Sequence, residues 1–148
     1  MKIEIISSSG RTQSNSLKTA EIIKSYFDTQ KITLDSHAKE SIEAQIIDLA
    51  LNELPIWNGE TWSANDNSSK KAWQPYAKRL NECEGLVLVV PEWNGFAPPQ
   101  LFNLLTYVQQ ELSYKPVFSV NFFWARRKFK CKFSKRFFIK KFKMHLSS

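Results

Sequence analysis

Short apolar runs alternate with helical patterns along the first 120 residues. Four runs have the length and composition of buried strands, at residues 2–6, 44–49, 86–90 and 115–120. Helical spacing of apolar residues predicts helices between them, at residues 17–27, 72–81 and 100–112. Residues 28–43 and 50–69 follow neither period and are interpreted as loops. Alternating strands and helices indicate an α/β fold, with a parallel sheet covered by helices on both faces.

Composition divides the chain near residue 120. Residues 1–120 hold 11 of the 21 basic side chains and all 14 acidic ones, whereas residues 121–148 hold 10 basic side chains, no acidic ones and 7 of the 11 phenylalanines. The overall charge of +7 therefore describes the tail and not the first 120 residues. No apolar run reaches the roughly 20 residues of a membrane span. Lys2 is not followed by the apolar stretch of a signal peptide, so we expect a cytoplasmic protein.

A polar loop follows the first strand and leads directly into a helix. This loop, residues 7–16, contains five serines together with Arg11, and Asn15 or Ser16 is the expected helix cap. A helix N-terminus with free N–H groups, hydroxyl donors and an arginine suits a phosphate group. The spacing matches neither a P-loop nor a G-x-G-x-x-G motif. An ordinary solvated loop remains the alternative.

A second loop, residues 91–99, follows the third strand. Trp93 offers a flat apolar surface, Asn94 an amide for a heterocycle, and Gly95 room for a planar ligand near the backbone. A plain Pro/Gly turn with Trp93 tucked into the core is the alternative. Ligands of open parallel sheets bind beyond the carboxyl ends of the strands, and a flavodoxin-like strand order would bring both loops together there. A phosphate cradle beside an aromatic and an amide suits flavin mononucleotide (FMN).

These two segments resemble motifs of the NADPH-dependent FMN reductase family. Residues 8–16, SSGRTQSNS, are similar to its G-S-x-R-x-x-S phosphate loop, and residues 91–103, PEWNGFAPPQLFN, to its P-E-Y-N-G-x-x-P-x-x-L-K-N segment. The resemblance covers about residues 2–120. It implies a flavodoxin-like three-layer sandwich, bound FMN, and electron transfer from NADPH or NADH to quinones, azo dyes or metal oxyanions. It also implies a homodimer or homotetramer.

The resemblance also implies which residues hold FMN. The phosphate would be held by Ser9, Arg11, Ser14 and Ser16. The isoalloxazine ring would lie along residues of the second loop, namely Pro91, Glu92, Trp93, Asn94 and Gly95. Three residues depart from the motifs, since Ser8 replaces a common Gly, Trp93 a common Tyr and Phe102 a common Lys. No catalytic side chain and no metal ligand is expected.

The tail departs from the family more seriously. The family continues after the fourth strand with a Gly-rich, flavin-contacting loop, a helix and a fifth strand, whereas this chain has no glycine after Gly95. We therefore expect an incomplete FMN-binding domain at residues 1–120, without the fifth strand and last helix, and a separate basic tail at residues 121–148. Three interpretations of the tail stay open. A frameshift is favoured by the abrupt loss of acids and glycines, and the others are a polyanion-binding or membrane-binding basic-aromatic arm and an edge strand.

The sequence thus predicts an FMN-dependent NAD(P)H oxidoreductase impaired by truncation, with weak flavin binding and poor solubility. The alternative is a truncated, non-catalytic remnant whose basic tail binds polyanions. Cys83 precedes a buried strand and is expected to be structural. The two histidines, His37 and His145, are isolated in sequence and carry no metal motif. Trp57, Trp62 and Trp73 are expected to pack beneath the long loop of residues 50–69.

Overall fold

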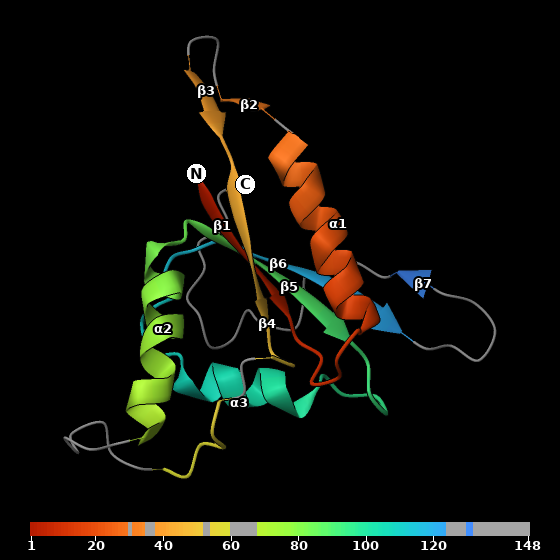
Figure 1. Cartoon of the computed structure of the whole chain (residues 1–148), viewed down its shortest axis with the longest axis vertical. Helices are drawn as coiled ribbons and strands as arrows, with labels where there is room; N and C mark the ends of the chain where they lie inside the picture. The colour runs from red at the N-terminus through yellow and green to blue at the C-terminus, as the bar shows by residue number, and fades with distance from the viewer. Residues whose placement is uncertain (30, 35–37, 52–53, 60–67, 124–129, 132–148) are drawn as a thin grey trace.

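The computed structural model describes residues 1–29, 31–34, 38–51, 54–59, 68–123 and 130–131. Its centre is one five-stranded sheet in the order β4-β1-β5-β6-β7 (Figure 1). The strands are β1 (Lys2–Ser7), β4 (Glu43–Asp48), β5 (Gly85–Pro91), β6 (Val117–Phe123) and β7 (Lys130–Cys131). The first four are parallel to one another, as predicted. The sequence order 2-1-3-4 of these parallel strands is that of a flavodoxin-like sheet.

Three helices cover the two faces of the sheet (Figure 1): α1 (Asn15–Thr29), α2 (Ser68–Glu82) and α3 (Pro99–Tyr107). Helix α1 packs on one face, where Ala20 meets Ile5 and Val89. Helices α2 and α3 pack on the other face, where Leu80 and Leu104 join the larger apolar cluster. The predicted three-layer α/β sandwich is confirmed.

Successive side chains along β1 point to opposite faces of the sheet, so the strand packs against helices on both sides. Ile5 points to the α1 side and Ile6 to the α2–α3 side, and both side chains are fully buried. β5 lies between β1 and β6, and Leu86 to Val90 along it are all buried. This two-sided burial is why β5 is an unbroken apolar run in the sequence.

The prediction of a loop over residues 28–43 was wrong for most of that segment. A small antiparallel hairpin of β2 (Lys31–Leu34) and β3 (Ala38–Ser41) lies there, and β3 leads into β4. Each strand has four residues, too few for a two-residue period to stand out. Helix α3 also ends at Tyr107 and not at residue 112, because Val108 adopts an extended conformation (ψ 124°).

The fourth strand continues past the expected boundary, since β6 ends at Phe123. β7 takes the fifth position in the sheet but runs antiparallel to β6, with Phe122 opposite Cys131. For Lys130 and Cys131, the two residues of β7, the edge-strand interpretation of the tail agrees with the structure. The other residues after 123 lie outside the described part of the chain, as do Trp62, His37 and His145. No helix in the described ranges is both long enough and apolar enough to cross a membrane.

Candidate functional site

The two predicted loops start from neighbouring strands. β1 ends at Ser7 and β5 at Pro91, and the strands are parallel partners, so both loops leave the same edge of the sheet. Ser8 fastens the first loop to β5: its backbone N–H and its hydroxyl both donate to the carbonyl of Val89, at 3.1 and 2.8 Å. The serine that replaces a common glycine therefore ties the loop to the sheet.

A cluster of buried hydroxyls shapes the first loop. Ser14 Oγ lies 2.9 Å from Ser16 Oγ, and Ser7 Oγ donates to Ser16 Oγ at 3.4 Å. Ser14 Oγ also accepts from the N–H of Leu17 at 3.1 Å, which makes Ser14 the cap of α1. The expected cap, Asn15 or Ser16, was wrong by one or two residues, because the helix begins at Asn15 itself.

The remaining residues of this loop differ sharply in exposure. Ser9 is fully buried, and its hydroxyl accepts from the N–H of Arg11 at 3.1 Å. Arg11 itself is exposed, as are Thr12 and Gln13. Gln13 has a positive φ of 51°, which turns the chain into the helix. The predicted phosphate residues thus form two groups: three serines that are buried and bonded within the loop, and one arginine that faces solvent.

The second loop closes in a tight two-residue turn. Trp93 and Phe96 exchange backbone hydrogen bonds of 2.7 and 3.1 Å, and the residues between them, Asn94 and Gly95, have φ of 52° and 85°. This is the pattern of a type I′ turn, for which Asn-Gly is the preferred sequence. The Asn94-Gly95 dipeptide is therefore itself a signal of this turn in the sequence. Asn94 and Gly95 are exposed at its tip.

Glu92 ties the second loop at both ends. Its backbone N–H donates to the carbonyl of Phe122 on β6, at 2.8 Å, and its carboxylate accepts from the N–H of Gly95, at 2.9 Å. Glu92 and Trp93 are half-buried, and so is Pro91 at the end of β5. The loop is therefore held in place without a ligand.

The structure brings the two loops into contact. The guanidinium carbon of Arg11 lies 5.3 Å from the ring centroid of Trp93, within the range of a cation–π interaction. A second contact joins Gly10 to Gln100 at the start of α3, where a Cβ placed on Gly10 would lie 2.1 Å from Gln100 Nε2. Gln100 was not predicted as a site residue, and no local pattern marks it, because the contact depends on the packing of α3 against the first loop.

We call the region where the first loop meets the second loop and α3 the loop junction. Two buried polar atoms of its described residues lack hydrogen-bond partners. In the described part of the chain, neither the indole Nε1 of Trp93 nor the amide Oε1 of Gln100 makes a hydrogen bond. An unpartnered buried donor or acceptor is costly and uncommon in folded proteins. Trp93 Nε1 is a donor and Gln100 Oε1 an acceptor, and both belong to residues that contact the first loop.

The long segment after β4 is clamped to α3. Asn103 donates from Nδ2 to the carbonyls of Leu54 and Pro55, at 3.1 and 2.9 Å, and accepts from the N–H of Trp57, at 2.9 Å. Trp57 packs edge-on against Tyr107, with ring centroids 5.2 Å apart. Trp73 is buried and stacks on its neighbour Tyr76. The expected packing of tryptophans beneath this segment holds for Trp57 and Trp73.

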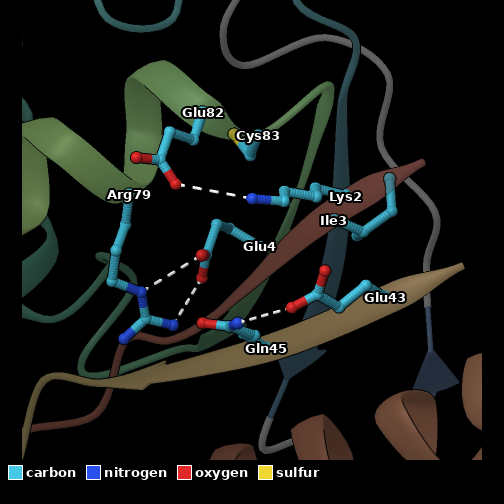
Figure 2. A pocket seen from close by; sticks show the side chains of 8 residues that line it. All are labelled: Lys2, Ile3, Glu4, Glu43, Gln45, Arg79, Glu82 and Cys83. Carbon is cyan, nitrogen blue, oxygen red and sulfur yellow. Dashed lines mark hydrogen bonds and ion pairs between the residues drawn. The ribbon is translucent and has the colours of Figure 1, made fainter.

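A cavity of about 40 Å³ lies at the opposite end of the sheet (Figure 2). An ion pair between Arg79 of α2 and Glu4 of β1 crosses it. Cys83 at its rim is buried, and its thiol donates to the carbonyl of Leu80 at 3.3 Å. Burial raises the pKa of this thiol above its usual value, so the thiolate is disfavoured. These features make Cys83 a packing residue, as expected.

A match to a known protein family covers most of the chain. The family described as NADPH-dependent FMN reductase matches residues 1–133. An NADPH azoreductase of Bacillus sp. (strain OY1-2) is 34% identical over 79 residues, which make up 53% of this chain and 42% of that protein.

Solved structures show the same fold. An oxidoreductase from Corynebacterium diphtheriae superimposes with a TM-score of 0.62 at 15% identity, over 81% of this chain and 62% of that one. FerB, a flavoenzyme NAD(P)H:(acceptor) oxidoreductase from Paracoccus denitrificans, gives 0.59 at 15% identity, over 81% and 59%. The NADH:FMN oxidoreductase EMOB gives 0.56 at 17% identity, over 81% and 58%. The chain spans less than two thirds of the length of each of these four relatives.

Proposed function

This chain belongs to the NADPH-dependent FMN reductase family, and we propose that it binds FMN where its first and second loops meet. The contact between Arg11 and Trp93 carries the proposal. The first residue belongs to the expected phosphate loop and the second to the expected ring-binding loop. Their proximity supports one continuous site for a ligand that has both an anionic group and a flat ring.

The residues at the junction fit FMN. The N-terminus of α1, a helix of 15 residues, offers N–H groups and a positive dipole end to the phosphate, and the exposed Arg11 adds a charge. The buried serines, Ser9, Ser14 and Ser16, would act by holding the loop in shape and by turning hydroxyl protons toward the phosphate. The isoalloxazine ring is flat and suits the face of the Trp93 indole, and its pyrimidine part carries an N–H group of the kind that Gln100 Oε1 lacks as a partner.

Bound FMN would supply the redox chemistry of hydride acceptance from a reduced nicotinamide. The chain would supply binding and orientation: Pro91 to Gly95 along the ring, with Trp93 as the flat surface. We assign no acid or base side chain to the reaction. The azoreductase relative supports an azo compound as electron acceptor, and a quinone belongs to the proposal through the family resemblance alone. NADPH is named for that relative and NADH for EMOB, so both donors belong to the proposal.

We further propose that FMN binding is weak. The resemblance places a Gly-rich, flavin-contacting loop after the fourth strand, and residues 121–148 contain no glycine. Two loops would then hold a ligand that three loops hold in the family. The proposed homodimer or homotetramer could add contacts from a neighbouring subunit, and the measured affinity reports the sum.

Titration of FMN, followed by quenching of its fluorescence at low and high salt, tests the proposal. We expect saturable binding that survives high salt. Trp93→Leu should weaken it by about five-fold to a hundred-fold, the usual contribution of stacking on an aromatic side chain. Trp57→Leu is the matched control, because Trp57 is also a half-buried indole but packs on Tyr107. Its FMN affinity should stay within two-fold of the unmodified chain, by the usual independence of separate sites.

Absent quenching, or quenching that disappears at high salt, would refute the proposal. Salt-sensitive binding of random nucleic acid by the same sample would instead support the non-catalytic remnant with a polyanion-binding tail.

A further inference from the structure

We propose that Arg11 discriminates FMN from flavins that lack a phosphate, by covering the Trp93 ring until a phosphate draws it away. The inference rests on the proposed FMN site. It assigns to Arg11 a second effect beyond attraction of the phosphate: without an anion, the same side chain competes for the ring surface that the flavin needs.

The position of Arg11 supports this double role. Its guanidinium lies over the indole ring of Trp93, 5.3 Å from the centroid. Among the described residues, no carboxylate forms an ion pair with Arg11, although its side chain is exposed. The guanidinium can therefore exchange the ring for an anion without breaking a salt bridge to any described residue.

The backbone around Arg11 is fixed, so the exchange is a side-chain movement. The N–H of Arg11 donates to Ser9 Oγ at 3.1 Å, and Gly10 is packed against the amide of Gln100. Ser8 holds the start of the loop to β5 through its hydroxyl. The loop can thus stay in place while the guanidinium swings between Trp93 and a phosphate at the N-terminus of α1.

The two contacts of the guanidinium differ in strength. A cation–π contact at an exposed site is weak, whereas a charge-assisted, bidentate contact with phosphate is among the stronger hydrogen-bonded interactions. FMN therefore breaks the cation–π contact of the guanidinium but gives it a stronger contact with the phosphate. Riboflavin must displace the guanidinium from the ring with no phosphate to receive it. Discrimination of this kind adds a penalty for the wrong ligand to the gain for the right one.

Equilibrium titration of FMN and riboflavin against two chains separates these effects. In Arg11→Ala, FMN should bind at least about ten-fold more weakly, because a charged hydrogen-bonded contact is lost. Riboflavin should bind about two-fold to five-fold more tightly, because the competing cation–π contact is gone. Arg11→Lys keeps the charge on a side chain that stacks less well, so it should retain more FMN affinity than Arg11→Ala and also gain riboflavin affinity.

Lys18→Ala is the matched control. Lys18 is an exposed cation in the first turns of α1, the helix that follows the first loop. Its removal changes the local charge by the same amount as Arg11→Ala without uncovering Trp93. We expect the riboflavin affinity of this variant to equal that of the unmodified chain. Inorganic phosphate supplies a readout without flavin: it should change the Trp93 component of the emission, obtained by subtracting Trp93→Phe, and should leave Arg11→Ala unchanged.

The two proposals fail in different ways. If FMN binds but Arg11→Ala leaves riboflavin affinity unchanged or lower, the covering role of Arg11 is overturned and the FMN site stands. If neither FMN nor phosphate affects the unmodified chain, the FMN site itself is overturned and this inference with it.

Discussion

The ion pair between Glu4 and Arg79 gives a stability prediction that can be worked from the structure. Glu4 on β1 has a side chain 7% exposed, and its two carboxylate oxygens accept from Arg79 Nε at 3.1 Å and Nη2 at 2.6 Å (Figure 2). Nη2 also donates to the carbonyl of Ile46 on β4, at 3.1 Å. Arg79→Met should destabilise the fold, because it leaves a buried carboxylate without a partner.

The expected loss follows from burial. Removing one partner of a fully buried pair costs about 3–5 kcal/mol. Arg79 is 34% exposed, so water already reaches the guanidinium and could partly solvate Glu4 after the substitution. We therefore expect a loss of about 2 kcal/mol. For a domain of this size, that loss lowers Tm by about 4–8 °C.

A second ion pair in the same chain supplies the control. Lys24 and Asp28 on α1 also approach to 2.6 Å, but their side chains are 38% and 48% exposed. Lys24→Met should cost at most about 0.5 kcal/mol. Urea unfolding followed by far-UV circular dichroism measures both variants. We argue that burial of the ion pair, and not the distance between its atoms, sets its contribution to stability. Equal losses of stability in the two variants, or a loss below about 0.5 kcal/mol for Arg79→Met, would refute this argument.

Two further predictions test the loop junction and the core. Gly10→Ala places a Cβ 2.1 Å from Gln100 Nε2, so we expect a stability loss of about 1 kcal/mol; Gln100→Ala in the same chain should remove most of it, and an unchanged loss in the double variant would contradict the contact. Burial raises the pKa of Tyr76 from 10.0 to about 12, while the charge of Arg79 acts in the opposite direction. Because the unfolded chain then releases this proton first, stability should fall between pH 10 and 12, by up to about 2–3 kcal/mol. The Tyr76→Phe variant should lose correspondingly less stability over that pH range in parallel urea titrations. Identical pH profiles of stability for the variant and the unmodified chain would contradict the prediction.

Most of the sheet could be predicted because its strands are buried on both faces. β5 is one apolar run from Leu86 to Val90, and such a run needs no partner to be recognised. The hairpin of β2 and β3 could not be found in this way. In the described part of the chain, β2 and β3 pair with each other and with no strand of the main sheet, so no long apolar run marks them. The early end of α3 was missed for a related reason, since Val108 and Leu112 continue the apolar spacing of the helix, and Leu112 is buried although its turn is not helical.

Individual residues of the candidate site could be predicted from the sequence, but the contacts between its segments could not. Ser9, Arg11 and Trp93 stand out because polar or aromatic residues follow buried strands. Gln100 does not stand out, since a glutamine in the first turn of a helix is ordinary. Its importance comes from the approach of Gly10. No pattern in the sequence marks the serines of the first loop as buried, because their burial depends on how the loop folds over the start of α1.

The distribution of exposure in the first loop sets how selectively it can recognise an anion. Ser9, Ser14 and Ser16 are buried, with hydroxyls that already bond within the loop, so they define a shape more than they add new contacts. The adaptable charge belongs to Arg11, which is exposed and rests on Trp93. Recognition of the phosphate and access to the ring surface therefore depend on the same side chain. A single substitution at Arg11 should change the affinity for FMN and the affinity for riboflavin in opposite directions, which separate phosphate and ring sites could not produce.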